Sequence, residues 1–326
     1  MKYQTRFRSL LCLLCALCLA PSSAQQASLV RFAVIGDSGP GKDGQYRVAE
    51  QMVAWHDRRP YELVLMLGDN IYGWLWRGGR KQEFADKFDR PYAELLRRGV
   101  VFRAALGNHD MYTRRGGNLI ESYERFHIDG AEGYYRFTAG EEPGGGPLVE
   151  FFVLNSTRLD NNKHDPAQLA WLEEALAAST ARWRIAYLHH PLYSTGASHG
   201  EDKRLRVKLE PLFHRVAASA SSNGPTANSA PRVQVVLSGH DHIYQRFHPQ
   251  QGIVYFVLGS SGKLRRENAR PSPAVAAVND QTRSFLLVEA TAEYLEFWAI
   301  DETGRAFDCA RLGPVGRVQS IGCPAP

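Results

Sequence analysis

Cysteine is scarce in this chain of 326 residues, and its distribution limits the sites that the protein can build. Three of the five cysteines lie within the first 18 residues, so only Cys309 and Cys323 occur in the rest of the sequence. In an oxidising compartment these two are expected to form a disulfide, which would stabilise the fold by about 3 kcal/mol. Two free thiols are the alternative.

An excess of charge of either sign is also missing. The chain has 39 basic and 34 acidic residues, and a formal net charge of +5. Lys2, Arg6 and Arg8 belong to an N-terminal segment without acidic residues, and the net charge without that segment is +2. This balance gives little reason to expect nucleic acid as a partner. The 44% of apolar and 22% of charged residues are typical of an ordinary soluble globular protein.

The N-terminal segment has no apolar run long enough for a permanent membrane anchor. Its run extends only from Leu10 to Ala20, whereas a spanning helix needs about 20 apolar residues. The basic residues before this run and the small residues Ser22 and Ala24 after it are typical of a secretory signal peptide. We therefore expect a signal peptide over residues 1–24 and a secreted or periplasmic protein. An uncleaved N-terminal anchor is the alternative.

Internal repeats and linker-like breaks are absent after residue 24, so residues 25–326 are expected to form a single domain. Apolar runs alternate with helical patterns in the first third, with strands expected at 29–35, 63–67 and 100–106 and helices at 43–58 and 80–97. This alternation predicts an α/β fold with a parallel sheet. Further strands are expected at 134–138, 148–154, 184–188, 233–237, 253–258, 284–290 and 294–300, and further helices from Asp165 and over 201–217.

Five of these strands end in a turn that carries side chains able to bind a metal. The turns are Gly36-Asp37, Gly68-Asp69-Asn70-Ile71-Tyr72, Gly107-Asn108-His109-Asp110, His189-His190-Pro191 and Gly239-His240-Asp241-His242. In α/β proteins, ligands gather at the carboxyl ends of strands, and glycine lets the backbone turn sharply there. One such turn is weak evidence, but five in succession indicate one shared site.

The donor types in these turns favour a pair of metal ions. Aspartate, asparagine and histidine supply oxygen and nitrogen, and the absence of cysteine disfavours a tetrahedral structural zinc site. Two ions about 3.5–4 Å apart, bridged by a carboxylate, clamp a phosphate and turn a bound water into hydroxide near neutral pH. The pattern therefore predicts phosphoester hydrolysis, in which an enzyme mainly positions groups and neutralises charge.

The succession GDSG, GDNIY, GNHD, HHP and GHDH resembles the calcineurin-like metallophosphoesterase superfamily, and within it the tartrate-resistant branch of the purple acid phosphatases. Two features are similar to that branch. Gly39 stands where most of the superfamily has a histidine two residues after the aspartate, and Tyr72 follows Asp69 by three residues. The resemblance runs from about residue 30 to about residue 300. It implies a four-layer α/β/β/α sandwich of two mixed β-sheets flanked by helices.

The resemblance also implies a binuclear metal centre and a role for each motif residue. Asp37, Tyr72 and His242 would hold Fe(III), Asn108, His189 and His240 would hold a divalent iron, zinc or manganese ion, and Asp69 would bridge both. His109 would contact the phosphate. His199 would be the second substrate histidine and a candidate general acid for the leaving alkoxide.

Several of these assignments have plain alternatives. Tyr72 would otherwise be a core aromatic after a strand, and His199 a surface histidine in a loop rich in serine and glycine. His190 and Asp110 are adjacent to implied ligands and are expected to orient them. The aromatic and basic stretch 74–80 would either stack on a leaving group or pack against a neighbouring loop.

The sequence thus predicts an exported acid phosphatase that hydrolyses small phosphomonoesters by attack of a metal-bound hydroxide. A phosphodiesterase or nucleotide pyrophosphatase with the same site is one alternative. A non-catalytic metal- or phosphate-binding module is another. The natural substrate and the divalent ion stay open.

Overall fold

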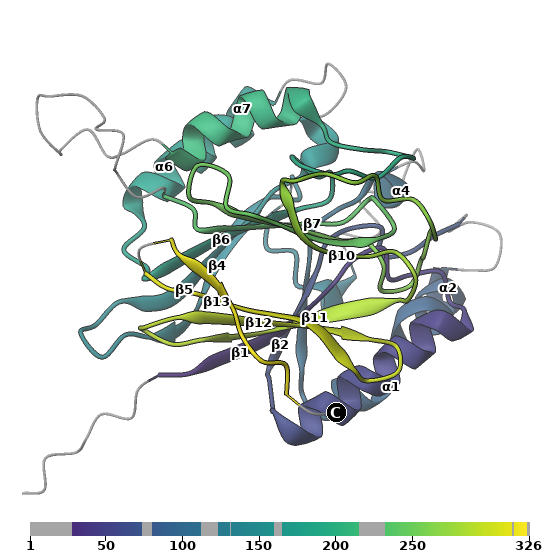
Figure 1. Cartoon of the computed structure of the whole chain (residues 1–326). Coiled ribbons are helices and arrows are strands. Elements are labelled where there is room, and N and C mark those ends of the chain that lie inside the picture. Colours follow the sequence, from purple (N-terminus) through teal and green to yellow (C-terminus); the bar gives the residue numbers. More distant parts are fainter. Residues whose placement is uncertain are drawn as a thin grey trace, which may run out of the picture.

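The computed structural model describes residues 28–73, 80–111, 123–130, 132–159, 165–214, 232–314 and 316–324. Two seven-stranded sheets are stacked in the middle of the molecule, and helices cover both outer sides (Figure 1). The expected four-layer arrangement is therefore confirmed. The predicted signal peptide and most of the aromatic stretch 74–80 lie outside the described residues.

One sheet, sheet A, joins strands from the two ends of the chain in the order β14-β13-β12-β11-β1-β2-β3. The strands are β1 (Val30–Ile35), β2 (Leu63–Met66), β3 (Val101–Ala104), β11 (Ser284–Ala290), β12 (Leu295–Asp301), β13 (Ala306–Leu312) and β14 (Val318–Ser320). Strands β1, β2 and β3 run parallel, as their alternation with helices predicted. Strand β1 pairs antiparallel with β11 on its other side, so the sheet is mixed.

The other sheet, sheet B, has the order β10-β8-β9-β7-β6-β5-β4. Its strands are β4 (Tyr135–Glu141), β5 (Pro147–Val153), β6 (Trp183–Leu188), β7 (Val235–Ser238), β8 (Tyr244–Phe247), β9 (Val254–Leu258) and β10 (Val275–Asn279). Strands β5, β6, β7 and β9 are successive parallel neighbours, and the outer pairs are antiparallel.

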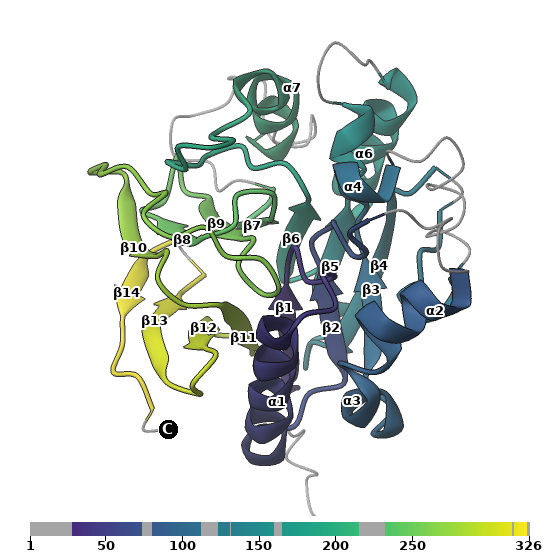
Figure 2. The same ribbon diagram turned by 90° about the vertical axis from the view of Figure 1, so that its right-hand side faces the viewer.

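Helices cover the outer face of each sheet (Figure 2). Those on sheet A are α1 (Asp43–Arg58), α2 (Arg80–Phe84), the π-helix η1 (Ala85–Asp89) and α3 (Ala93–Arg97), and those on sheet B are α6 (Pro166–Ala178) and α7 (Lys203–His214). The short elements are α4 (Asn108–Met111) and the 3-10 turns η2 (Glu124–Phe126) and η3 (Ser156–Arg158). The predicted start of α6 is confirmed, because Asp165 accepts a hydrogen bond from the Gln168 N–H at 3.1 Å.

Three apolar clusters fill the spaces between the four layers. Strand β2 shows why its sequence is continuously apolar: Leu65 packs between the two sheets, whereas Val64 and Met66 pack against the helices on the other face. Successive side chains of a strand point to opposite faces, so a strand buried on both sides carries no polar alternation.

The single helix predicted for residues 80–97 is wrong, because the chain breaks it at Pro91. The Arg90 N–H donates to the Ala85 carbonyl five residues earlier, at 2.9 Å, which is the hydrogen bond of a π-helix. Pro91 has no N–H to continue the helix, and its ring collides with the carbonyl four residues before it. A new helix, α3, begins only at Ala93.

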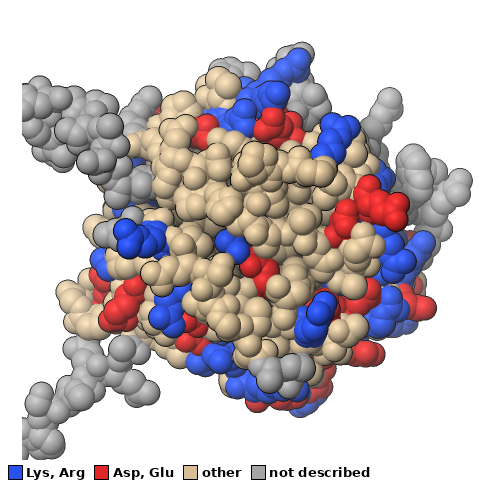
Figure 3. All heavy atoms as spheres, viewed as in Figure 1, with Lys and Arg blue, Asp and Glu red and all other residues tan. Residues whose placement is uncertain are grey.

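The expected disulfide between Cys309 and Cys323 is present, and it ties β13 to the segment after β14. On the face shown in Figure 3, basic and acidic side chains are interspersed rather than gathered by sign. None of the helices in the described part of the chain is long and apolar enough to cross a membrane.

Candidate metal centre

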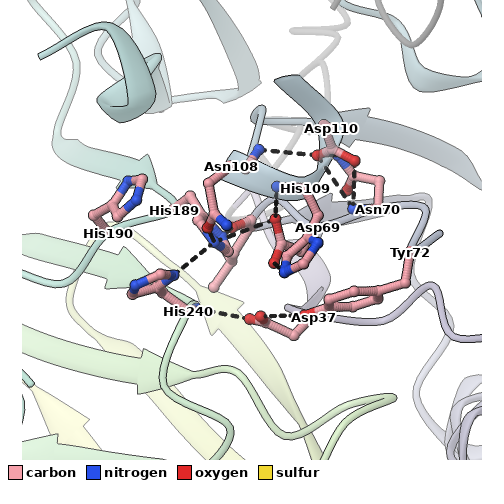
Figure 4. Close-up of polar contacts among 12 residues, drawn as sticks. Asp37, Asp69, Asn70, Tyr72, Asn108, His109, Asp110, His189, His190 and His240 are labelled. Carbon is pink, nitrogen blue, oxygen red and sulfur yellow. Dashed lines mark hydrogen bonds and ion pairs between the residues drawn. The ribbon is translucent and has the colours of Figure 1, made fainter. Parts of the chain in front are cut away.

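Turns from both sheets meet at the carboxyl ends of their strands (Figure 4). Sheet A contributes Asp37 after β1, Asp69 and Tyr72 after β2, and Asn108 after β3, while sheet B contributes His189 after β6, and His240 and His242 after β7. The fold thus brings together all seven residues that the sequence motifs singled out, although 205 positions separate the first from the last.

The first donor cluster lies around the carboxylate of Asp37. The Tyr72 hydroxyl donates to Asp37 Oδ1 at 2.7 Å, and His242 Nε2 lies 3.2 Å from that hydroxyl. His242 Nε2 and Asp37 Oδ1 are 3.4 Å apart. The buried phenol of Tyr72 therefore points its oxygen at other potential ligands instead of filling the apolar core.

The second donor cluster surrounds the Nε2 atom of His189. This atom lies 2.9 Å from Asn108 Oδ1, 3.1 Å from His240 Nδ1 and 3.4 Å from Asp69 Oδ1. The other ring nitrogen, Nδ1, donates to the Leu67 carbonyl at 2.9 Å, so Nε2 of the neutral ring carries a lone pair. Lone pairs of nitrogen and oxygen thus converge on one point, which is the arrangement that a cation stabilises.

Asp69 lies between the two clusters. Its Oδ1 atom accepts a hydrogen bond from the His109 N–H at 2.8 Å. Burial and the nearby charge of Asp37 raise the pKa of Asp69 well above its ordinary value. Within the described part of the chain, no lysine or arginine nitrogen lies within 4.0 Å of either carboxylate. Two buried carboxylates that have only histidines, and no lysine or arginine, beside them in the described part of the chain fit a site for positive ions.

The backbone at this site is held in a strained conformation. Asp37, Asp69 and His240 have φ values of 52°, 51° and 70°, in the left-handed region that non-glycine residues rarely adopt. Such strain persists where the surrounding structure fixes the geometry, and it is concentrated at functional sites. The same strained backbone conformation in three turns that carry potential ligands therefore supports a functional role for the carboxyl ends of these strands.

Two glycines of the motifs lie where the neighbouring ligand leaves no room for a side chain. A Cβ on Gly107 would lie 2.2 Å from Asp69 Oδ1, and one on Gly239 would lie 2.6 Å from Asp37 Oδ2. Both distances are far below van der Waals contact, so a side chain at either position would displace a carboxylate. Glycine here lets the backbone of one ligand turn approach the ligand of another.

Asp110 holds two ligand turns together, which agrees with its expected orienting role. Its carboxylate accepts hydrogen bonds from the N–H groups of Gly107, Asn70 and Ile71 at 2.9, 3.0 and 3.2 Å. Burial and the charge of Asp69 raise the pKa of Asp110 to about 7, although these donors oppose the shift. The turn with Asp69 and the turn with Asn108 are thereby fixed to one another.

His190 lies closer to the centre than an orienting role requires. A nitrogen of His190 and one each from His189 and His240 lie within 4.8 Å of one another, so the three rings form a possible metal-binding group. The Nδ1 atom of His190 is 2.9 Å from the Ser156 hydroxyl. The adjacent histidines His189 and His190 were visible in the sequence. The sequence did not reveal that a nitrogen of each ring lies near the same possible metal position.

The two candidate substrate histidines lie at the mouth of the site. The His109 side chain is 46% exposed, with Nε2 4.0 Å from Asp69 Oδ2, and its ring centre is 4.7 Å from that of Tyr72. The ring centre of His199 is 4.3 Å from that of His240 and 6.0 Å from that of His242. The fold therefore brings His199 to the metal-binding residues.

Asp241 fixes the segment that carries His199, and sequence reasoning gave it no role. Its Oδ2 atom accepts hydrogen bonds from the Ser194 hydroxyl and, at 3.0 Å, from the Gly200 N–H. These contacts bracket His199 on both sides. The position of Asp241 between His240 and His242 was the feature of the sequence that could have indicated this role.

A pocket of about 450 Å³ opens beside His199 and His240. It is lined by His190, Pro191, His199, Gly200, Glu201, Asp202, Lys203, Arg204 and His240. This space is large enough for a small leaving group next to the donor clusters.

A family model described as calcineurin-like phosphoesterase matches residues 30–244, which include every residue of both donor clusters. The chain belongs to the calcineurin-like phosphoesterase family. The resemblance seen in the sequence motifs is therefore confirmed, and this family membership implies a binuclear metal centre at the two clusters.

Acid phosphatases are among the relatives of this family member. Tartrate-resistant acid phosphatase type 5 of Homo sapiens is 25% identical over 324 residues, which cover 90% of this chain and 94% of that protein. Purple acid phosphatase 17 of Arabidopsis thaliana is 27% identical over 263 residues, which cover 73% of this chain and 70% of that protein.

Solved structures agree in fold. GAP50, the anchor in the inner membrane complex of Plasmodium, matches with a TM-score of 0.66 and 16% identity over 91% of this chain and 90% of its own. Purple acid phosphatase PPD1 from yellow lupin seeds matches with a TM-score of 0.64 and 18% identity, over 92% of this chain and 57% of its own. Because an anchor and a phosphatase share the fold, the case for catalysis depends on the side chains.

Proposed function

We propose that this phosphoesterase family member is an exported binuclear metallophosphatase that hydrolyses small phosphomonoesters. The observation that carries the proposal is the pair of donor clusters joined by Asp69. One contains Asp37, Tyr72 and His242, and the other contains Asn108, His189 and His240. The names of the acid phosphatase relatives support a monoester substrate.

The composition of the clusters suggests which ion each would hold. The phenol of Tyr72 and the carboxylates of Asp37 and Asp69 are hard donors that become anionic, so the first cluster suits Fe(III). The neutral amide and imidazoles of the second cluster suit a divalent iron, zinc or manganese ion. When bound, such a pair supplies Lewis acidity and lowers the pKa of a coordinated water.

The residues at the mouth would position the ester and move its protons. His109 would donate a hydrogen bond to the phosphate, because its ring is half exposed and its backbone is fixed by Asp69. His199 would protonate the oxygen of the leaving group as the phosphorus–oxygen bond breaks and a water oxygen bonds to phosphorus. Asp241 would keep His199 in reach by holding its segment.

Export is supported by two independent features. The first 24 residues have the pattern of a signal peptide, with basic, apolar and small residues in order. The disulfide between Cys309 and Cys323 is of the kind that persists in oxidising compartments. Together they favour a secreted or periplasmic enzyme.

The choice of ester is tested by comparing nitrophenyl phosphate with bis-nitrophenyl phosphate. We expect kcat/KM to be at least tenfold higher for the monoester, because the second ester group removes one of the charges that the site binds. Chelation should abolish both activities, and added metal should restore them. A strong diester preference would instead establish a phosphodiesterase or nucleotide pyrophosphatase.

The ferric assignment is tested by the visible spectrum. Metal-loaded protein should show a charge-transfer absorption from the Tyr72 phenolate, and Tyr72→Phe should lose it. Tyr193→Phe is the matched control, because the Tyr193 hydroxyl also donates to a carboxylate, Glu210, at 2.7 Å, but lies outside both clusters. A colourless wild-type protein with full activity on zinc or manganese alone would refute Fe(III) and leave the phosphatase intact.

A further inference from the structure

The segment after β9 runs along the first donor cluster. The Ser261 N–H donates to the Gly36 carbonyl at 3.2 Å, and the Lys263 N–H donates to the Asp37 carbonyl at 3.1 Å. The Arg265 N–H then donates to the His242 carbonyl at 2.9 Å. Lys263 and Arg265 are therefore fixed by their backbones directly to two ligand-bearing turns.

The ammonium group of Lys263 lies over Tyr72. Its Nζ atom is 4.2 Å from the centre of the Tyr72 ring, within range of a cation–π interaction. The same ring contacts the half-exposed ring of His109. Burial and the charge of His189 lower the pKa of His109, and the positive charge of Lys263 contributes in the same direction. Lys263 therefore lies at the mouth of the site, beside the residue that would contact the phosphate.

Arg265 extends this positive charge toward His199. Its side chain is exposed. Burial is the main cause that lowers the pKa of His199, and the charge of Arg265 also contributes. The charge of Arg265 acts on Lys263 as well. The Arg265 backbone is bonded to the carbonyl of His242, whose ring centre is 6.0 Å from that of His199, so Arg265 belongs to the His199 side of the mouth and Lys263 to the His109 side.

Neither cation forms a close ion pair within the described part of the chain. In the described part of the chain, no carboxylate oxygen lies within 4.0 Å of a side-chain nitrogen of Lys263 or Arg265. The neighbouring pocket differs, because its Glu201 forms ion pairs with Arg206 at 2.6 Å and Lys203 at 3.4 Å. The positive charge beside Tyr72 is therefore free of a close ion pair, while the buried carboxylates of Asp37 and Asp69 act on Lys263 from beyond 4.0 Å.

We propose that Lys263 and Arg265 are specificity-determining residues that bind a second anionic group on the leaving group of the substrate. The preferred esters are then phosphomonoesters of alcohols or phenols that carry a carboxylate or a further phosphate. This inference rests on the proposed phosphatase function. The donor clusters and His109 would bind the transferred phosphate. Arg265 is exposed and bonded to the turn of His242, on the side of the mouth where His199 would protonate the leaving group.

The experiment uses two esters of the same size that differ in one charge, 3-carboxyphenyl phosphate and 3-carbamoylphenyl phosphate. For the wild-type protein, kcat/KM should be about tenfold higher for the acid than for the amide. Lys263→Met and Arg265→Met should each reduce this ratio, and the double variant should bring it close to one. Because the preference is electrostatic, added salt should reduce the wild-type ratio.

Arg266→Met is the matched control. Arg266 belongs to the same segment, but its Nε donates to the Gln281 carbonyl, away from the donor clusters. The ratio of kcat/KM for the acid to kcat/KM for the amide in Arg266→Met should stay within twofold of the wild-type ratio. Lys263→Arg keeps the charge and should retain the preference. If the double variant does not fold, the salt dependence of the wild-type ratio decides.

The inference would be overturned by a wild-type ratio near one, by a ratio that salt does not change, or by a ratio that the folded double variant retains. A variant Lys263→Met that shifts the visible absorption but not the ratio would also overturn it, since the lysine would then act on Tyr72 alone. Failure of the proposed function is a separate result, in which the metal-loaded wild type hydrolyses neither ester.

Discussion

Asp69→Asn is expected to lower kcat/KM for phosphomonoesters at least about 1000-fold, which corresponds to about 4 kcal/mol of lost transition-state stabilisation. The asparagine has nearly the same shape but no negative charge, so it cannot join the two donor clusters as a carboxylate can. Elemental analysis should find that the variant retains less than the full metal content of the wild type.

The metal-free form of the same variant should be at least as stable as metal-free wild type. Burial and the charge of Asp37 raise the pKa of Asp69 above its unfolded value. A folded-state pKa that is raised makes the free energy of unfolding fall as pH rises from the unfolded pKa through the folded one. An uncharged asparagine removes this cost, which thermal unfolding of both metal-free proteins at pH 7 measures.

Asp57→Asn is the control for Asp69→Asn, because the Asp57 carboxylate is 60% exposed and pairs with Arg98 outside the site. It should keep full activity and metal content. If Asp69→Asn were inactive and also less stable without metal, the loss of activity would reflect damage to the fold, and the bridging role would lose its support.

His109→Ala should lower kcat by about 100- to 1000-fold while the metal content stays unchanged. The backbone N–H of residue 109, which donates to Asp69, is kept in the alanine variant. Only the imidazole that faces the mouth is removed. Steady-state kinetics with nitrophenyl phosphate, together with elemental analysis of the same sample, separates the loss of catalysis from the loss of ions.

His248→Ala provides the comparison, because His248 is exposed after β8 and contributes to neither cluster. Its kcat should equal that of the wild type. The opposite finding, with wild type and His109→Ala equally inert although both bind metal, would favour a non-catalytic binding module.

The fold was predictable where local sequence and tertiary structure agree. The apolar runs of β1 and β2 identified buried parallel strands, because burial on both faces excludes polar alternation. Strands β8, β10, β13 and β14 were not predicted. Among them, β10 is only partly buried and β14 has three residues, so neither carries a strong hydrophobic pattern. Strand β10 also pairs with β8, about 30 residues earlier in the chain, so no local hairpin pattern marks it.

The candidate site was predictable to the extent that its residues belong to strand ends. Asp37 and His189 come within two residues of the end of a buried strand, and Asn108 lies four residues after the end of β3, so their proximity follows from sheet topology. The position of Lys263 does not follow in this way. It depends on how the segment after β9 pairs with the turn after β1, and no local pattern in the sequence records that contact.

The position of β1 in sheet A affects when the metal centre can form during biosynthesis. Strand β1 pairs on one side with β2, but on the other side Val30 pairs with Ala290, close to the C-terminus. A chain that leaves the ribosome or an export channel N-terminus first therefore holds β1 with one edge unpaired until the last strands emerge. The ligand turn after β1 gains its final support only then. For the exported enzyme that we propose, ions would consequently be acquired after translocation, from the metal pool of the compartment in which folding is completed.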